Sequence, residues 1–319
     1  MNIEQKTNSS TSTDIAAMQC YAQPNICLYN ADNKDVMSEL QDNSVDVILT
    51  DPPYLYLKNQ KLEREFDEQL FFNECKRILK QDGFIVLFGR GTSFYRWNTI
   101  LDELGFNFKE EIIWQKQPTS PAMAIGRIHE TISIFSKGEG VINRIRVPFF
   151  EKYKHEPEKI LEVVKRISTT FGNRDTFRQL KQYYENGKLE YYSSHNGHGV
   201  SLSADNMKTV NRTVQFARGL EEGITEQTII KETRDHYNTF HPTQKPVRLL
   251  ERLLALVVPK DKPREQITVL DPFGGSFSTM EAVYNMGMKG ISCEIDEEYF
   301  EAGKKRIENL PPIQTKLFD

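Results

Sequence analysis

The segment Asp51-Pro52-Pro53-Tyr54 combines residue types that suit binding of an amine carried on a flat ring. Asp51 and the Pro52 carbonyl can each accept a hydrogen bond from an NH₂ group, and Tyr54 offers a face on which a heterocycle can stack. The two prolines fix φ and supply no N–H donor, so they hold the chain extended. An ordinary Asp-Pro turn is the alternative interpretation. The apolar run directly before the segment favours a ligand site, because ligands bind at the carboxyl ends of strands in open α/β sheets.

A second segment with small residues, VLDPFGGSFST, also follows an apolar run and precedes a helical pattern. Gly274, Gly275 and Ser276 would let the backbone approach a ligand closely. Glu294 stands 23 residues after Asp271, at the expected end of the next strand, where an acid can bind a ribose diol. The alternative is a tight strand–helix turn with a solvated acid. The sequence contains neither GxGxxG nor GxxxxGK[ST], which disfavours dinucleotide and P-loop sites.

The third segment is HPTQKP, residues 241–246, directly before a helical pattern. Thr243 and Lys245 could contact an anionic or zwitterionic group at the start of that helix. A plain N-terminal cap is the alternative interpretation.

The elements that must position these segments alternate between strand and helix patterns. The β-branched and apolar runs predict strands over 26–30, 45–50, 84–89, 266–271 and 289–296, and two antiparallel neighbours over 110–116 and 130–137. The apolar stripes predict helices over 33–40, about 65–80, 93–105, 246–258, 278–287 and 297–310. Gly83 and Gly105 are the expected helix ends. This alternation indicates an α/β fold with helices on both faces of a sheet.

The alternation stops near residue 140 and returns near 236, so one α/β domain is expected to form from both ends of the chain. Residues 141–220 hold 14 Lys and Arg against 8 Asp and Glu, a net charge of +6, while the remaining chain carries −10. A basic module in an acidic protein suggests contact with a polyanion. A chance excess on a solvated surface is the alternative.

Composition excludes several broad classes. The 319 residues, with 19 Phe and 13 Tyr, supply enough core to disfavour wholesale disorder. The sequence has no run of 18 apolar residues and no signal-peptide pattern, so we expect a cytoplasmic protein without a membrane partner. The four scattered cysteines make a metal site or a disulfide framework improbable.

The three segments and the basic insert, in the order DPPY, basic insert, HPTQKP and DPFGGS, resemble the β class of amino-group DNA methyltransferases. These enzymes are circularly permuted and act on adenine N6 or cytosine N4. The resemblance covers nearly all of 26–140 and 236–310, including the segments IIWQK and RIHETISIFSK. It implies a three-layer α/β/α Rossmann-like methyltransferase fold with an inserted target-recognition domain. The implied parts are a flexible tail (1–25), a catalytic half (26–140), the recognition insert (141–235) and a cofactor-binding half (236–319).

The resemblance also implies roles for individual residues. S-adenosylmethionine would be the cofactor and double-stranded DNA the partner, with no metal; a homodimer and a cognate restriction endonuclease stay open. The residues implied to hold the flipped target base are Asp51, Pro52, Pro53 and Tyr54. The residues implied to hold the cofactor are Asp32, Thr243, Lys245, Asp271, Phe273, Gly275, Ser276 and Glu294.

Two choices within this reading depend on single residues. Asp51 favours adenine as the target, since relatives acting on cytosine N4 more often carry Ser at this position. Methylation of a protein amide is an alternative, but the relatives with that activity usually carry Asn there. RNA is a further alternative substrate. The family loop usually reads F-x-G-S-G-T, whereas Phe277 and Ser278 occupy its last two positions here. Because Phe lacks the conformational freedom of Gly, we expect either a reshaped loop or weakened cofactor binding. A DNA-binding module that has lost catalysis is therefore a rival hypothesis.

Overall fold

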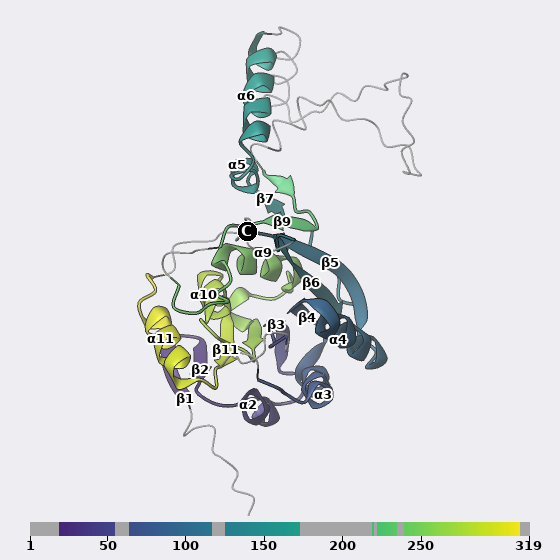
Figure 1. Cartoon of the computed structure of the whole chain (residues 1–319), viewed down its shortest axis with the longest axis vertical. Coiled ribbons are helices and arrows are strands. Elements are labelled where there is room, and N and C mark those ends of the chain that lie inside the picture. The colour runs from purple at the N-terminus through teal and green to yellow at the C-terminus, as the bar shows by residue number, and fades with distance from the viewer. Residues whose placement is uncertain are drawn as a thin grey trace, which may run out of the picture. The chain divides into compact units, whose positions relative to one another are not determined.

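The structure is a computed structural model that describes residues 19–54, 64–116, 125–172, 219, 222–234 and 239–312. It divides into two compact units, one formed by residues 1–143 and 227–319 and the other by 144–226. The first unit therefore takes its elements from both ends of the chain (Figure 1). The assignment of 141–235 to target recognition stays a prediction.

The first unit is built on a mixed sheet that has nine strands in the described part of the chain, in the order β1-β2-β11-β10-β3-β4-β6-β5-β9. The strands are β1 (Gln19–Gln23), β2 (Ile26–Tyr29), β3 (Val45–Thr50), β4 (Leu79–Gly89), β5 (Asn107–Gln115), β6 (His129–Ser136), β9 (Ile229–Lys231), β10 (Thr268–Asp271) and β11 (Lys289–Cys293). Strands β2, β11, β10, β3 and β4 are parallel, whereas β6 runs antiparallel to β4 and to β5. The carboxyl ends of the parallel strands and the start of β6 thus meet at one edge of the sheet.

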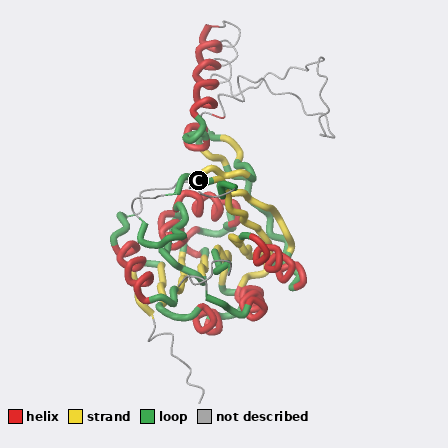
Figure 2. The backbone as a smooth tube through the Cα atoms, in the orientation of Figure 1, coloured by secondary structure: helices red, strands yellow, loops and turns green. Residues whose placement is uncertain are grey.

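Helices cover both faces of this sheet, which gives the predicted three-layer α/β/α arrangement (Figures 1 and 2). One group packs on the face that holds the central core: α2 (Asn33–Glu39), α3 (Glu68–Ile78) and α4 (Gly91–Glu103). The other group is α9 (Val247–Val257), α10 (Ser278–Asn285) and α11 (Glu297–Glu308), with a short 3₁₀ turn over Arg264–Gln266. Among these, α9 is buried almost throughout, and its buried residues include two charged ones, Glu251 and Arg252, the latter paired with Glu232 at 2.9 Å.

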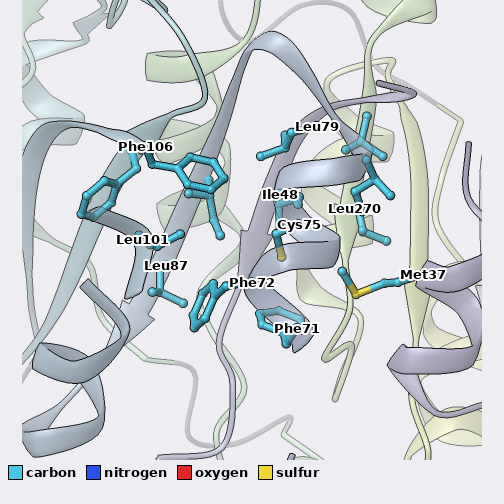
Figure 3. Close-up of a cluster of buried hydrophobic side chains, with 14 of the residues drawn as sticks. Met37, Ile48, Phe71, Phe72, Cys75, Leu79, Leu87, Leu101, Phe106 and Leu270 are labelled. Atoms are coloured by element: carbon cyan, nitrogen blue, oxygen red, sulfur yellow. The ribbon is translucent and has the colours of Figure 1, made fainter. Parts of the chain in front are cut away.

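The core beneath α3 explains why this part of the chain folds as it does (Figure 3). Phe71, Phe72 and Cys75 of α3 recur at helical spacing and face Ile48 of β3 and Leu87 of β4. All five side chains are buried, so the apolar stripe of α3 lies against the sheet. This packing fixes the end of β3, where the segment Asp51–Tyr54 begins.

The second unit consists, in its described residues, of β7 (Arg146–Val147), α5 (Phe149–Lys152), α6 (Pro157–Gly172) and β8 (Ile224–Thr225). Strands β7 and β8 pair antiparallel. The buried Lys152 ammonium donates to the Thr225 carbonyl (2.6 Å) and lies 3.7 Å from the Glu226 carboxylate. The predicted recognition residues between 173 and 218 lie outside the described residues.

The structure departs from the sequence expectations at two places. Residues 19–23, assigned to a tail, form β1 and pair with β2. Gly83 does not end a helix: α3 ends at Ile78, and β4 already begins at Leu79 and runs through Gly83. A Cβ at Gly83 would lie 3.0 Å from the Asp46 carbonyl oxygen, so this glycine serves close packing within the sheet rather than a helix end.

Candidate active site

A cavity of about 570 Å³ opens at the edge where the parallel strands end. Every residue that the sequence singled out for the base or the cofactor lines it: Asp32, Asp51, Pro52, Pro53, Tyr54, Thr243, Lys245, Asp271, Phe273, Gly275, Ser276 and Glu294. The loops after β2, β3, β10 and β11 supply most of these side chains, as the rule for open α/β sheets requires.

The segment after β3 is held in place by hydrogen bonds and ring packing. Ser93 Oγ, in the first turn of α4, donates to the Tyr54 carbonyl (2.7 Å). The Tyr54 hydroxyl donates to Asp51 Oδ1, and its ring lies 6.1 Å from the Trp97 ring, centroid to centroid. Trp97 is fully buried, so Tyr54, which lines the cavity, rests on a fixed support.

The loop after β10 is tied to the end of β11 through Glu294. The Gly275 N–H donates to Glu294 Oε2 (2.8 Å), and the Asp296 N–H donates to Glu294 Oε1 (2.8 Å). Burial raises the pKa of Glu294 above its usual value, against these two bonds, which lower it. The carboxylate therefore has a fixed orientation between two loops that border the cavity.

Asp271 and His241 are buried titratable groups on the same cavity wall. Burial raises the pKa of Asp271 to about 7, and the Phe273 N–H donates to its Oδ1 (3.2 Å). Burial, followed by the nearby Lys245 charge, lowers the pKa of His241 to about 4. The His241 Nδ1 accepts the Thr243 N–H (3.3 Å), and its ring packs edge-on against Tyr299, 4.4 Å between centroids. A neutral imidazole is consistent with this acceptor role.

The loop at Phe277 is not reshaped in the way that its bulky side chain led us to expect. Its backbone adopts the left-handed conformation (φ 53°, ψ 28°) that glycine takes most readily, and its ring is fully buried. Gly274 and Gly303 provide the space for this ring. A Cβ at Gly274 would lie 2.3 Å from a Phe277 ring atom, and a Cβ at Gly303 would lie 2.6 Å from one. The ring also contacts Phe300 edge-on, at 5.9 Å between centroids. The loop thus keeps the left-handed turn, and the bulky ring points into the protein rather than into the cavity.

The charged residues that were not singled out from the sequence include an ion pair beside Asp51–Tyr54. Glu130, in β6, lines the cavity, and Lys116, directly after β5, forms an ion pair with it. Each lies in a segment quoted for its family resemblance, but neither was given a role. The available signal was the position of the two charges, Lys116 directly after β5 and Glu130 at the start of β6, at the edge where the other site residues gather.

Lys245 also differs in its surroundings from the cofactor role assigned to it. Its ammonium donates to Asp51 Oδ2, lies 3.5 Å from Glu130 Oε2 and sits 5.0 Å above the Phe88 ring. Burial lowers the pKa of Lys245, but the Asp51 and Glu130 charges outweigh it and hold that pKa above its usual value. The contact made by Lys245 is therefore with the half of the site assigned to the base.

Comparison with known proteins decides the family. A family model described as DNA methylase, for the N6 and N4 methyltransferases, matches residues 45–305. This chain belongs to the N6/N4 DNA methylase family. The predicted DNA methyltransferase chemistry, with S-adenosylmethionine as methyl donor, is confirmed at this level; adenine and cytosine are not distinguished.

Individual relatives agree with that membership. The chain is 26% identical over 287 residues to the Type II methyltransferase M.HpaI of Haemophilus parainfluenzae, covering 86% of this chain and 71% of the relative. It is 22% identical over 310 residues to the Type II methyltransferase M2.DpnII of Streptococcus pneumoniae, covering 90% and 91%.

Solved structures support the fold. The PvuII DNA methyltransferase, titled cytosine-N4-specific, aligns with a TM-score of 0.54 at 16% identity, covering 91% of this chain and 88% of its own. The M1.HpyAVI complex with SAM aligns with a TM-score of 0.50 at 20% identity, covering 88% and 99%. At these identities the likeness extends to the α/β methyltransferase architecture alone.

Within the described residues, no helix is long and apolar enough to cross a membrane. The same part of the chain contains no group of three or more His, Cys, Asp or Glu side chains arranged to hold a metal ion.

Proposed function

We propose that this protein methylates the N6 amine of an adenine flipped out of duplex DNA at a specific sequence. The observation that carries the proposal is that Asp51–Tyr54 and the Glu294–Gly275 loop pair line one cavity. An amine acceptor and a nucleoside-binding acid therefore face a common space. The juxtaposition suits direct transfer between two bound groups, for which proximity supplies much of the rate acceleration.

The residues of the cavity fit S-adenosylmethionine. Glu294, held by two backbone N–H groups, is placed to accept hydrogen bonds from a ribose diol, and Asp32 lines the same end. A Cβ at Gly275 would approach the His241 ring to 3.2 Å, so the absence of a side chain keeps the cavity open there. A volume of about 570 Å³ lies within the range of cofactor pockets. When bound, S-adenosylmethionine supplies an electrophilic methyl group on a sulfonium centre.

The other half of the cavity acts on the target base. An amine inside a base pair is unreachable, so the base must leave the stack before it can react. Tyr54 then stacks on the ring, and its ring is oriented by Trp97 and by its bond to Asp51. Asp51 and the Pro52 carbonyl accept the two amine hydrogens, which leaves the nitrogen lone pair directed toward the cofactor side of the cavity.

Adenine is preferred to cytosine N4 in this proposal because of Asp51. Family resemblance associates Asp at this position with adenine enzymes, and both bases present the same kind of amine to the same acceptors. The named relatives are Type II methyltransferases, which supports modification of a defined recognition sequence here. The basic residues of 141–220 would bind the DNA backbone, and a cognate endonuclease and a homodimer stay open as partners.

Expression in a host that lacks adenine and N4-cytosine methylation, followed by mapping of modified bases in its genome, tests the proposal. We expect N6-methyladenine at one position of a recurring short sequence. N4-methylcytosine at such a sequence would replace adenine as the target, and an unmodified genome would overturn the proposed activity.

A further inference from the structure

Four charged side chains of alternating sign form a chain behind the segment Asp51–Tyr54. Lys116 pairs with Glu130 Oε1, Lys245 Nζ lies 3.5 Å from Glu130 Oε2, and Lys245 donates to Asp51 Oδ2. The side chains are largely buried: their exposed fractions are 13% for Lys116 and Glu130, 9% for Lys245 and 22% for Asp51. Lys245 is thus shared unequally between two carboxylates at one wall of the cavity.

Asp51 is fully engaged in this arrangement. Its Oδ1 accepts the Tyr54 hydroxyl, and its Oδ2 accepts the Lys245 ammonium. Each carboxylate oxygen has a second lone pair, so an amine could still approach. An ammonium bound to the carboxylate nevertheless withdraws electron density and competes with a neutral amine, because charge-assisted hydrogen bonds are about twice as strong as neutral ones.

Glu130 offers Lys245 a second place to bind. Its Oε2 is buried and has no hydrogen-bond partner among the described residues, although it points at an ammonium just beyond hydrogen-bond distance. A buried oxygen left unpaired costs free energy, which a bond from Lys245 would recover. The Phe88 ring, 5.0 Å from Lys245 Nζ, supports the cation between the two carboxylates.

The charges around Glu130 keep its carboxylate ionised, so that it can accept a hydrogen bond from Lys245. Burial raises the pKa of Glu130, but the charges of Lys245, Lys116 and Arg234 outweigh it and keep that pKa below its usual value. Glu130 is therefore charged whether or not Lys245 is bonded to it. Lys245 also keeps its proton in either place, since both carboxylates favour the ammonium.

We propose that Lys245 is a positioning residue that occupies Asp51 while the cavity lacks a base and moves to Glu130 when the exocyclic amine enters. The move leaves Asp51 Oδ2 to the amine and gives Glu130 Oε2 its missing partner. Glu130 is then a second positioning residue, which acts only through Lys245. This inference rests on the proposed function, because it requires an amine-bearing base to enter beside Asp51.

Binding to two duplexes tests the exchange, once genome mapping has given the recognition sequence. One duplex carries the target base, and the other carries an abasic site at that position; S-adenosylhomocysteine is present so that no methyl transfer occurs. The ratio of the two affinities reports only base entry. In Glu130→Gln we expect about tenfold weaker binding of the intact duplex, with the abasic duplex within about twofold of the parent.

The double variant separates positioning from a structural role. If Glu130 acts only by accepting a hydrogen bond from Lys245, then Glu130→Gln should have little effect once Lys245 is replaced by Met. In that background we expect the ratio of affinities for the intact and abasic duplexes to change by less than about threefold. Equal losses on both duplexes, or a full tenfold loss in the Lys245→Met background, would overturn the exchange. A parent protein that methylates no DNA would instead overturn the proposed function, so the two failures are distinguishable.

Lys116→Met provides a second variant with the opposite expected sign, and it also serves if Glu130→Gln fails to fold. Removing Lys116 leaves Glu130 to attract Lys245 more strongly, so the preference for the intact duplex should rise at least about twofold. An unchanged or lowered preference would contradict the exchange.

Discussion

Gly303 in α11 leaves the space that the Phe277 ring fills. A Cβ at Gly303 would lie 2.6 Å from Phe277 Cδ2, and Gly274 presses on the opposite side of the ring, where a Cβ would lie 2.3 Å from Cε1. Two glycines far apart in the sequence thus accommodate an aromatic residue in the loop after β10. The left-handed backbone at Phe277 is maintained by this packing.

Gly303→Ala should therefore destabilise the protein despite the better helix propensity of alanine. The added methyl group overpacks the space beside the Phe277 ring, which lowers the free energy of unfolding by about 1–3 kcal/mol. The higher helix propensity of alanine raises it by at most about 1 kcal/mol. The sign should reverse in a Phe277→Gly background, where the ring is gone and only the propensity gain remains. Thermal unfolding of the four proteins of this cycle measures both signs. A loss of the same size in both backgrounds would contradict the packing relationship.

Asp271 makes stability depend on pH in a defined direction. Burial raises its pKa to about 7 in the folded protein, against about 3.9 in an unfolded chain. The folded state therefore favours the protonated acid, and the contribution of Asp271 is most favourable below about pH 4 and is lost as the pH rises toward 7.

In Asp271→Asn this penalty disappears, because the amide stays neutral and can still accept the Phe273 N–H. We expect the variant to gain stability relative to the parent as the pH rises from 4 to 8, by up to about 3–4 kcal/mol. Chemical denaturation across that range, with Asp102→Asn on the exposed face of α4 as control, measures the difference. A difference that does not change with pH would show that Asp271 ionises normally.

Glu294→Ala should weaken cofactor binding about ten- to a hundredfold, the loss expected for hydrogen bonds to a charged acceptor. The effect has two sources, since Glu294 also fixes the Gly275 loop through its 2.8 Å bond. Titration calorimetry with S-adenosylhomocysteine measures it. Glu297→Ala, an exposed acid three residues along the chain, is the matched control and should bind as the parent does. An unchanged dissociation constant in Glu294→Ala would leave Glu294 with a solvated or purely structural role.

The basic excess of residues 141–220, a net charge of +6, predicts a steep salt dependence of DNA binding. Four to six phosphate contacts would give a log–log slope of about −4 to −5. Arg144 and Lys165 are exposed, and Arg146 forms an ion pair with Glu222 within the unit. Arg144→Glu with Lys165→Glu should weaken binding to any sequence and flatten the slope by about 2. Lys289→Glu, an exposed reversal in the first unit, is the control; equal effects from both would place DNA binding outside the second unit.

The sequence predicted the parallel strands and the loops at their ends, because buried strands and capped helices have strong local patterns. It also brought Asp51, Asp271 and Glu294 to one edge of a sheet, since that placement follows from topology alone. The strand at 19–23 was missed because its pairing with β2 depends on tertiary context rather than on local pattern. Gly83 was misread for the same reason: a glycine after a helix and a glycine inside a strand look alike in one dimension.

The side-chain network could not be predicted in the same way. Which carboxylate receives Lys245 depends on distances between β3, β6 and the segment before α9, which are separated by many residues. Phe277 was unfavourable by residue type alone, and its accommodation depends on Gly303, which no local motif connects to it.

The central claim is that the half of the cavity at Asp51–Tyr54 presents the target amine, while the half around Glu294 and Gly275 holds the cofactor. Mass spectrometry of nucleosides, after DNA bearing the recognition sequence is incubated with S-adenosylmethionine and either the parent protein or Asp51→Ala, tests it most directly. Calorimetry should first show that the variant binds S-adenosylhomocysteine within a few-fold of the parent. We predict N6-methyldeoxyadenosine with the parent and none with Asp51→Ala; equal amounts from both proteins would contradict the account.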